Sequence, residues 1–356
     1  MDRSRRDLLT GTLGMVAAAP LATAADPAPG FLAWDFLQPG DTVAVIAPSS
    51  PPSDPERSYA AIRAYFAQSP YGLQVDIPDG LVQPTEPLHA ANTASERARF
   101  IEQALHSPAK AVWAILGGGW STELLPLLSR MRRPRQVKPL IGYSDTTSLH
   151  VFFNQAWGWP SLHGVVLGAN GDILPDTSWN KTALSATLDV LTGARPWLDY
   201  ALRPLNRQAA EPAILDGLRV LGGNGLLLSA TQGTDDFALD TRGALVFIES
   251  VALNPGMLSR MLDGFSYSPL LRRAAAVMFG SWIETGGTPN PAEVELQFDY
   301  IQRRFANAMQ ALGIPVLRAQ DIFGHGPVNL PLPLNTRARL ELGASARLRV
   351  SANGAG

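Results

Sequence analysis

The sequence predicts an α/β fold built on a parallel sheet with helices on both faces. Short apolar runs alternate with helix-length amphipathic runs through the first half of the chain, which is the pattern of repeated β–α units. The apolar fraction of 46% is ample for a large core, and the chain contains no cysteine. Disulfides and thiolate chemistry are therefore excluded, and burial of the core must stabilise the fold.

Four strands and four helices are expected in the first half. Residues 41–48 form an uncharged, β-branched run that ends at Pro48, as a buried strand does. Residues 54–68 are typical of a helix, with Asp54 before its first turn and Pro55 within it. The other strands are expected at 73–78, 111–116 and 139–143, and the other helices at 93–107, 121–131 and 145–158, the last of them started by Asp145.

The pattern weakens between residues 166 and 212, where loop-like segments flank one plausible helix at 181–193. We place the domain boundary there, which gives an N-terminal domain at 25–165, a linker region at 166–212 and a C-terminal domain at 213–356. The C-terminal domain is expected to hold strands at 213–223, 244–250, 274–282 and 337–342, and helices from Asn224, at 256–265 and at 291–312.

Residues 1–24 have the layout of a cleavable export signal. Arg5 and Arg6 precede a short, weakly apolar stretch that ends in the small residues Ala22, Thr23 and Ala24. The paired arginines favour the twin-arginine type, which exports folded proteins, so the sequence predicts a periplasmic protein; a disordered tail is the alternative. The stretch is too short and too broken by glycine for a transmembrane span, and no stable membrane insertion is expected once it is removed.

The distribution of charge gives no indication of a nucleic-acid partner. The formal net charge is −2, and basic residues are scattered along the chain. One basic run at 130–138 is short and has the character of a solvated surface segment. We therefore expect a small-molecule or peptide ligand rather than a polyanion.

Ser121 lies where the third strand gives way to a helix, directly after three glycines and Trp120. Ligands of parallel α/β proteins gather at such loops, and the glycines and the helix start offer backbone N–H groups for an oxyanion. Ser121 is either a nucleophile or an N-cap; a capping box would need Glu or Gln at position 124, which is Leu124. The segment fits neither the phosphate-binding glycine motifs nor the G-x-S-x-G elbow.

A serine nucleophile needs a base and an acid that orients it. Of the five histidines, His325 stands between two glycines before a proline-rich loop, where it can project into a cleft, and His163 is a second candidate for lining a site. His106 and His150 fall within expected helices, as packing or surface residues do. Glu249 ends an otherwise apolar strand, so it either pairs with a partner such as a histidine or reaches water. No zinc-binding motif is present, and no metal is expected.

Taken together, these segments resemble the LD-carboxypeptidase family of serine peptidases, which includes the murein tetrapeptide LD-carboxypeptidases and the microcin C immunity peptidases. The resemblance covers essentially the whole chain after residue 24. The segments that carry it are VAVIAPSSP (43–51), SERARFIEQAL (95–105), ILGGGWSTELLPLL (115–128), IGYSDTTSLH (141–150), LHG (162–164), LGGNGLLLSATQGT (221–234), LVFIES (245–250) and GHGPVNLPLPL (324–334).

The resemblance implies a flavodoxin-like N-terminal domain that carries the nucleophile Ser121, and a C-terminal swivelling β/α domain that carries Glu249 and His325. It further implies a metal-free hydrolase without a cofactor, commonly a homodimer, that releases the terminal D-alanine of murein tetrapeptide. The groups around the nucleophile are expected to bind the oxyanion and the substrate; they are Gly118, Gly119, Trp120 and Thr122.

Three features depart from the family's usual pattern. Gly119 and Trp120 replace the usual residues beside the nucleophile, Ser250 follows the acid where Asp is common, and an export signal is present. The first departure leaves the substrate preference open, and two alternative functions remain. One is an amidase acting on peptidyl- or aminoacyl-nucleotides, as in microcin immunity, and the other is a periplasmic muropeptide-binding protein without chemistry.

Overall fold

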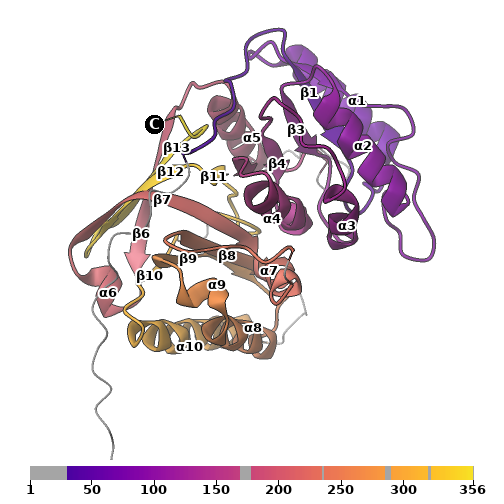
Figure 1. Ribbon diagram of the computed structural model, residues 1–356. Helices are drawn as coiled ribbons and strands as arrows, with labels where there is room; N and C mark the ends of the chain where they lie inside the picture. Colours follow the sequence, from indigo (N-terminus) through magenta and orange to yellow (C-terminus); the bar gives the residue numbers. More distant parts are fainter. Residues whose placement is uncertain (1–29, 169–177, 235, 285–289, 320–321, 356) are drawn as a thin grey trace, which may run out of the picture. The chain divides into compact units, whose positions relative to one another are not determined.

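The computed structural model describes residues 30–168, 178–234, 236–284, 290–319 and 322–355, so the expected export signal lies outside the described residues (Figure 1). The first sheet has the strand order β11-β5-β4-β3-β1-β2, in which all pairs are parallel except β11 with β5. Its strands are β1 (Thr42–Ile46), β2 (Gln74–Asp76), β3 (Ala111–Ala114), β4 (Leu140–Gly142), β5 (Ser161–His163) and β11 (Leu332–Leu334).

Helices cover both faces of this sheet, because alternate residues of its buried strands point to opposite sides. Trp113 and Ile141 share one core cluster with α1 and α5, whereas Val112 and Leu140 share another with α2, α3 and α4. The elements are α1 (Pro55–Gln68), α2 (Ala94–His106), η1 (Ser121–Leu124), α3 (Leu125–Leu128), η2 (Ser144–Thr146), α4 (Thr147–Ala156) and α5 (Ser178–Leu191). The expected parallel α/β sheet is therefore confirmed.

The second sheet closes into a barrel with the order β10-β6-β13-β12-β7-β8-β9, and β9 pairs with β10. Strands β7, β8, β9 and β10 run parallel, and the others pair antiparallel. The strands are β6 (Trp197–Pro204), β7 (Ala213–Asn224), β8 (Leu245–Val251), β9 (Ala276–Ile283), β10 (Val316–Arg318), β12 (Arg337–Leu342) and β13 (Ala346–Ser351).

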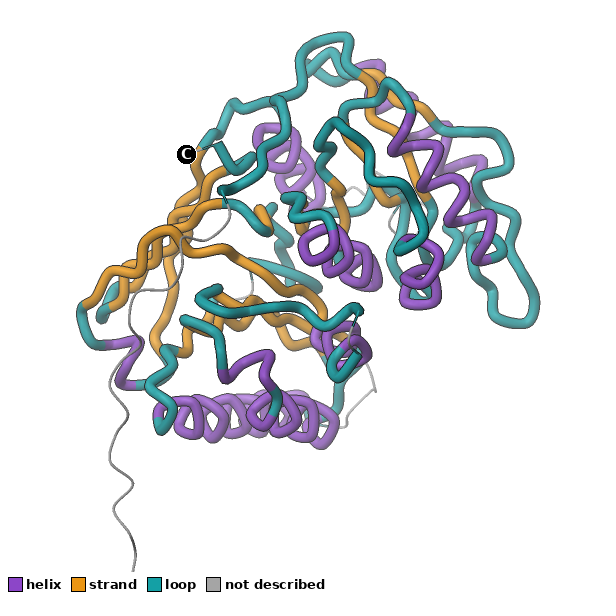
Figure 2. The backbone as a smooth tube through the Cα atoms, in the orientation of Figure 1, coloured by secondary structure: helices purple, strands orange, loops and turns teal. Residues whose placement is uncertain are grey.

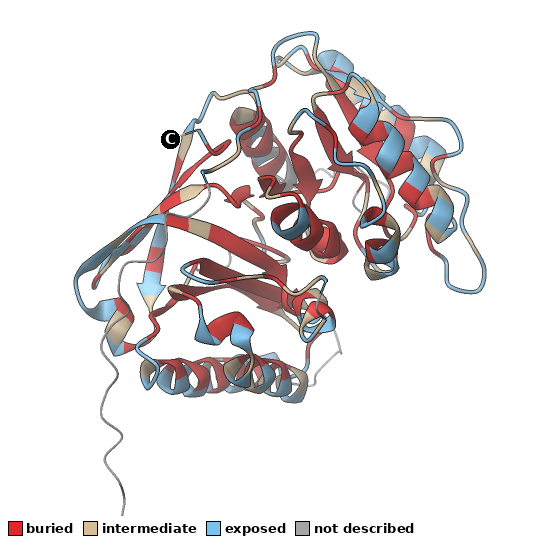
Figure 3. Ribbon diagram, viewed as in Figure 1, coloured by how far each residue is buried: buried red, intermediate tan, exposed pale blue. Residues whose placement is uncertain are grey.

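The helices of the second half are α6 (Arg207–Ala210), α7 (Gly225–Thr231), α8 (Pro255–Tyr267), α9 (Pro269–Arg272) and α10 (Pro291–Gln310). Helices α8 and α10 lie side by side and pack their apolar faces under β8 and β9 (Figures 1 and 2). Strands β1, β3, β4, β5, β8 and β9 are almost entirely buried, whereas β6 and the first half of β7 are partly exposed, as are the outer faces of α1, α2 and α10 (Figure 3). No helix of the described chain is long and apolar enough to cross a membrane.

The stretch 166–212 differs from the expected linker. It contains α5, which includes most of the helix expected at 181–193, and it contains β6, a full strand of the barrel. Strand β6 alternates buried and exposed residues along WLDYALRP, because one face lines the core and the other faces solvent. The stretch therefore supplies a helix that packs on the first sheet and a strand of the barrel.

The helix expected at 121–131 is shorter in the structure. A single 3₁₀ turn, η1, precedes α3, which ends at Leu128. Pro126 lies in the first turn of α3, where a residue without a backbone N–H is tolerated at a helix start but not within a longer helix. Ser121 is consequently held in a 3₁₀ turn that follows the loop after β3, rather than on a long, regular helix.

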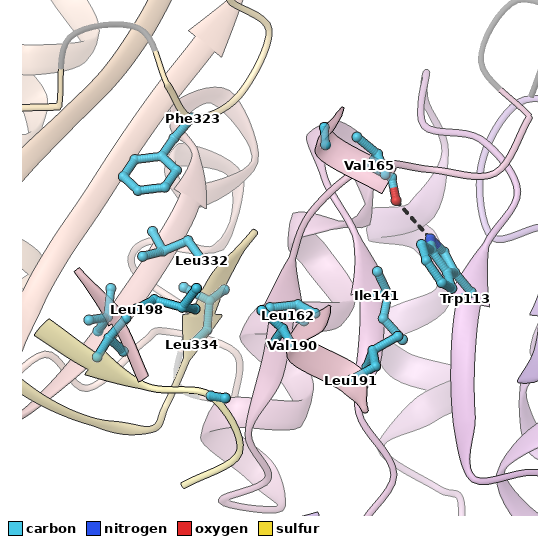
Figure 4. Close-up of a cluster of buried hydrophobic side chains, with 14 of the residues drawn as sticks. Trp113, Ile141, Leu162, Val165, Val190, Leu191, Leu198, Phe323, Leu332 and Leu334 are labelled. Carbon is cyan, nitrogen blue, oxygen red and sulfur yellow. Dashed lines mark hydrogen bonds between the residues drawn. The ribbon is translucent and has the colours of Figure 1, made fainter. Parts of the chain in front are cut away.

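One core joins the two sheets. Leu162 of the first sheet, Leu332 and Leu334 of β11, and Leu198 and Phe323 from the barrel side belong to a single buried cluster (Figure 4). The segment that follows His325 returns to the first sheet and adds β11 beside β5. This return fixes the path of the loop that carries His325.

Candidate active site

Glu249 lies near the end of β8 with its carboxylate completely buried. Its Oε2 atom is 2.7 Å from Nδ1 of His325, and its Oε1 atom accepts a hydrogen bond of 3.3 Å from the Asn224 amide. Gly324, at φ +88°, lies so close that any side chain there would collide with this carboxylate. Both carboxylate oxygens thus have partners, which is what a buried charge requires.

The Nδ1 atom of His325 faces Glu249, so Nε2 is the ring nitrogen left for other chemistry. The imidazole retains a small exposed fraction, and the Tyr143 ring packs against it with 4.8 Å between ring centroids. Burial, together with the Glu249 charge, raises the pKa of Tyr143 to about 12, so this phenol stays neutral. Tyr143 directly follows β4, so this contact joins the first sheet to the loop that carries His325.

Ser121 is buried and is the first residue of η1. Its hydroxyl donates to the backbone carbonyl of Asp145 over 2.5 Å, and its backbone N–H donates to Oδ2 of the same residue over 2.9 Å. The N-cap position belongs to Trp120, and no side chain caps η1. The N-cap interpretation of Ser121 is therefore wrong.

Asp145 also has a role different from the one expected. It lies inside the 3₁₀ turn η2, and its carboxylate binds the N–H of Ser121 instead of starting helix α4. Burial raises the pKa of this carboxyl above its ordinary value, although the hydrogen bond from the Ser121 N–H and the nearby Arg97 charge act in the opposite direction. A sequence pattern could not reveal this contact, because residues 121 and 145 follow different strands.

The turn before Ser121 is held in an unusual conformation. Trp120 has φ +84°, which is rare for a residue with a side chain, and 38% of its surface is exposed. Gly118 has φ +107°, and a Cβ atom there would collide with Ser50 at the end of β1. The hydroxyl of Ser50 accepts the N–H of Gly119 over 3.2 Å. The glycines therefore permit a close approach of two loops at the carboxyl edge of the sheet.

Thr122 completes the turn. Its hydroxyl lies 3.0 Å from that of Ser148, and its backbone N–H belongs to the first turn of η1, where a helix offers no acceptor. Such an N–H can donate to a developing oxyanion. On the other side of the site, the Thr147 hydroxyl accepts the Asn224 N–H over 2.9 Å and joins α4 to the end of β7.

The structure brings Glu249 and His325 into direct contact. It places the Ser121 hydroxyl against the carbonyl of Asp145. Asp145 is two positions after Tyr143 in the sequence, and the ring of Tyr143 packs against His325. The remaining candidate, His163, is fully buried, neither ring nitrogen has a hydrogen-bond partner in the described chain, and burial keeps its pKa well below the usual value. It is a neutral packing residue beside Tyr143. The described residues include no cluster of His, Cys, Asp and Glu that could hold a metal ion.

The chain matches two family models. One, described as the LD-carboxypeptidase N-terminal domain, matches residues 43–164, and the other, described as the LD-carboxypeptidase C-terminal domain, matches residues 219–340. A candidate carboxypeptidase of Rickettsia conorii is 32% identical over 232 residues, which cover 64% of this chain and 67% of the relative. A protein of Bacillus subtilis named as a probable murein peptide carboxypeptidase is 29% identical over 308 residues, 85% of this chain and 90% of the relative.

Two solved structures share the fold. The muramoyltetrapeptide carboxypeptidase of Oxalobacter formigenes superposes with a TM-score of 0.66 and 23% identity, covering 87% of this chain and 98% of its own. The microcin C7 self-immunity protein in complex with glutamyl sulfamoyl guanosine superposes with a TM-score of 0.70 and 17% identity, covering 90% of this chain and 98% of its own. These structures extend the likeness across both sheets.

Proposed function

The chain belongs to the LD-carboxypeptidase family, and we propose that it is a serine carboxypeptidase that releases the terminal D-alanine of murein tetrapeptide by hydrolysing an L,D peptide bond. The observation that carries this proposal is the 2.7 Å contact between the buried Glu249 carboxylate and Nδ1 of His325. The serine that we propose as the nucleophile, Ser121, is buried in η1. This contact leaves Nε2 of the imidazole to act as a base.

In the proposed reaction, the Ser121 hydroxyl attacks the carbonyl carbon of the L,D bond and its proton passes to Nε2 of His325. The tetrahedral intermediate then collapses, the C–N bond breaks, and His325 returns the proton to the amine of the leaving D-alanine. Water repeats the two steps on the acyl-enzyme and frees Ser121. Glu249 keeps the proton of the neutral imidazole on Nδ1 and stabilises the imidazolium.

The resting geometry adds one requirement to this mechanism. The Ser121 hydroxyl donates to the Asp145 carbonyl, so it must turn from that acceptor to His325 before it can react. The Ser121 N–H is also engaged, by the Asp145 carboxylate, and is not available as an oxyanion donor. The oxyanion donors we propose are the N–H groups near Gly118 and Thr122, each contributing about 3 kcal/mol to the transition state. Gly119 and the exposed Trp120 would border the bound peptide.

The test is mass spectrometry of purified protein incubated with disaccharide tetrapeptide, beside the Ser121→Ala variant. Tripeptide and free D-alanine should form with the wild type and not with the variant. An intact tetrapeptide in both samples would refute the murein activity. A panel of aminoacyl-nucleotides and D-amino-acid amides would then separate an amidase from a protein that binds muropeptides without cleaving them.

We also propose that the enzyme is exported and acts as a homodimer. Arg5 and Arg6 support the first statement, so Arg5→Lys with Arg6→Lys should shift the protein from the periplasmic to the cytoplasmic fraction. Family membership supports the second, which light scattering of the purified protein tests. A double variant that still reaches the periplasm would contradict the export statement. A protein that is strictly monomeric at micromolar concentration would contradict the homodimer statement.

A further inference from the structure

We infer that Arg97 is a positioning residue for the proposed nucleophile: its buried guanidinium and the Asp145 carboxylate clamp the peptide bond between Trp120 and Ser121 at both polar atoms. This inference rests on the proposed role of Ser121. Arg97 lies in the first half of α2, far from Ser121 in sequence, and its side chain is almost completely buried.

The guanidinium of Arg97 binds four oxygens. Nε donates to the Asn92 carbonyl over 2.9 Å, and Nη1 donates to the carbonyls of Pro48 over 2.6 Å and of Trp120 over 3.1 Å. Nη2 forms an ion pair with the carboxylate of Glu123, two residues after Ser121. Arg97 therefore ties the end of β1, the start of α2 and both sides of the Ser121 turn to one rigid, planar group.

The carbonyl of Trp120 and the N–H of Ser121 belong to the same peptide unit. Arg97 holds its oxygen and the Asp145 carboxylate holds its nitrogen, so the plane of this peptide cannot rotate without breaking a charge-assisted hydrogen bond. The orientation of this plane sets the direction of the Cα–Cβ bond of Ser121, and hence where its hydroxyl can reach. The clamp also secures Trp120 at φ +84°, a conformation that persists only when its surroundings enforce it.

Packing alone does not explain this arrangement. An arginine cannot shed its charge, so burial requires that its N–H groups find acceptors, and here two of the four acceptors flank Ser121. Lys138 provides a contrast at the other end of α2. It is also a buried cation, but its Nζ atom donates to the Ala104 and Ser107 carbonyls at the C-terminus of α2, and neither acceptor belongs to the Ser121 turn. Lys138 is therefore the matched control.

The experiment measures the rate at which a fluorophosphonate probe labels Ser121, with intact-mass and peptide analysis, in the wild type and in Arg97→Lys, Arg97→Met and Lys138→Met. The probe reports the reactivity of the serine without any assumption about the substrate. We expect both Arg97 variants to label at least tenfold more slowly per folded molecule, because small displacements of a reacting group cost large factors in rate. Lys138→Met should stay within twofold of the wild type, even if it is less stable.

With tetrapeptide, kcat per folded molecule of the Arg97 variants should fall in parallel with the labelling rate while KM stays within threefold. The folded fraction must be measured for each variant, because unfolded enzyme lowers the apparent kcat and leaves KM unchanged. Arg97→Lys keeps the charge but not the planar fork, so a folded Arg97→Lys protein that labels within threefold of the wild-type rate would contradict the inference. If neither Arg97 variant folds, Glu123→Ala decides. The Glu123 carboxylate pairs with Nη2 of Arg97 and is 46% exposed, so its removal frees the guanidinium to shift from the Trp120 carbonyl. A wild-type labelling rate in Glu123→Ala would therefore also contradict the clamp.

The two proposals fail in distinguishable ways. If the wild type is not labelled at Ser121, the nucleophile assignment is wrong. If the wild type is labelled and the Arg97 variants react equally fast, the assignment stands and only the positioning role is refuted.

Discussion

At the scale of single residues, the proposed catalytic groups belong to three separate elements and act only when held together. Ser121 comes from η1, Glu249 from β8, and His325 from the loop before β11. The base is useless without the nucleophile it deprotonates, and the nucleophile is weak without the base. Their contributions to the rate must therefore be coupled rather than independent.

This coupling gives a quantitative prediction. Ser121→Ala and His325→Ala should each lower kcat by about 10⁴-fold or more, and the double variant should lose little beyond either single one. Kinetics with tetrapeptide at saturating concentration would measure all three. Losses that multiply in the double variant would show that the two residues do not work as a unit.

The residues of the site differ in how far the sequence alone reveals them. Glu249 stands out as a lone charge on an apolar strand, and His325 as a histidine between glycines, so both were predictable as candidates. Arg97 and Asp145 were not, because Arg97 looks like an ordinary polar residue of a helix and Asp145 like a helix start. Their roles depend on which loops meet at the sheet edge, and that is a property of the tertiary fold.

At the scale of elements, most strands are predictable from the sequence, whereas others, among them β5, β6 and β11, are not. Strands β1 and β3 are buried, uncharged runs, β8 is a buried apolar run that includes the single charged residue Glu249, and all three are expected from the sequence. Strands β5 and β11 have only three residues each, too few for a periodic pattern, and β6 lies in the stretch expected to be a linker. Their pairing, rather than local propensity, makes them strands.

Asn206 shows how one side chain joins several elements. It caps α6 by accepting the Ala209 N–H over 3.1 Å, and it also accepts the Val316 N–H of β10 over 3.1 Å. Its amide donates to the carbonyls of Ala306 and Ile314. Asn206→Ala should lower the free energy of unfolding by about 3 kcal/mol or more, because buried partners are left unpaired.

A simple cap provides the comparison for this prediction. Asp54 accepts the Arg57 N–H over 3.0 Å at the exposed start of α1, so Asp54→Ala should cost only about 1 kcal/mol. Urea denaturation of both variants would measure the difference. Equal losses would mean that the contacts of Asn206 with β10 and α10 contribute nothing beyond capping.

The C-terminus of α2 gives a prediction about pH. Burial, aided by the charge of Lys110, lowers the pKa of Lys138 to about 8, whereas an unfolded lysine titrates near ~10.4. Between these values the unfolded chain binds more protons than the folded one, so the contribution of Lys138 to stability rises with pH. The neutral amine still has two N–H donors for its two carbonyl acceptors.

The stability of the wild type relative to Lys138→Met should therefore increase between pH 8 and pH 10. Urea denaturation of both proteins at the two pH values measures this difference and cancels the titration of all other groups. A difference that stays constant, or that falls as the pH rises, would show that Lys138 does not titrate in this window.

At the scale of the whole molecule, the two halves are not independent domains. The chain returns from the barrel side to add β11 to the first sheet, and the amide of Asn353 donates to the Trp34 carbonyl over 2.8 Å. The buried cluster of Figure 4 contains residues of both sheets. The sequence pattern weakens at residues 166–212, which suggests a domain boundary there. The buried core nevertheless continues from one sheet to the other, because residues far apart in the sequence pack together in it.

A continuous core predicts a single cooperative unfolding transition, with coincident midpoints by far-UV circular dichroism and by tryptophan fluorescence. Leu334 of β11 is completely buried where the first sheet meets the barrel, so Leu334→Ala should lower the free energy of unfolding by about 2–5 kcal/mol and keep the transition single. Leu296→Ala is the control, because this leucine on α10 is 68% exposed and its loss should cost less than about 0.5 kcal/mol. Two separated transitions in Leu334→Ala would mean that the halves fold independently. The contacts across the candidate active site, from Tyr143 to His325 and from Thr147 to Asn224, would then be open to disruption by domain motion without unfolding either half.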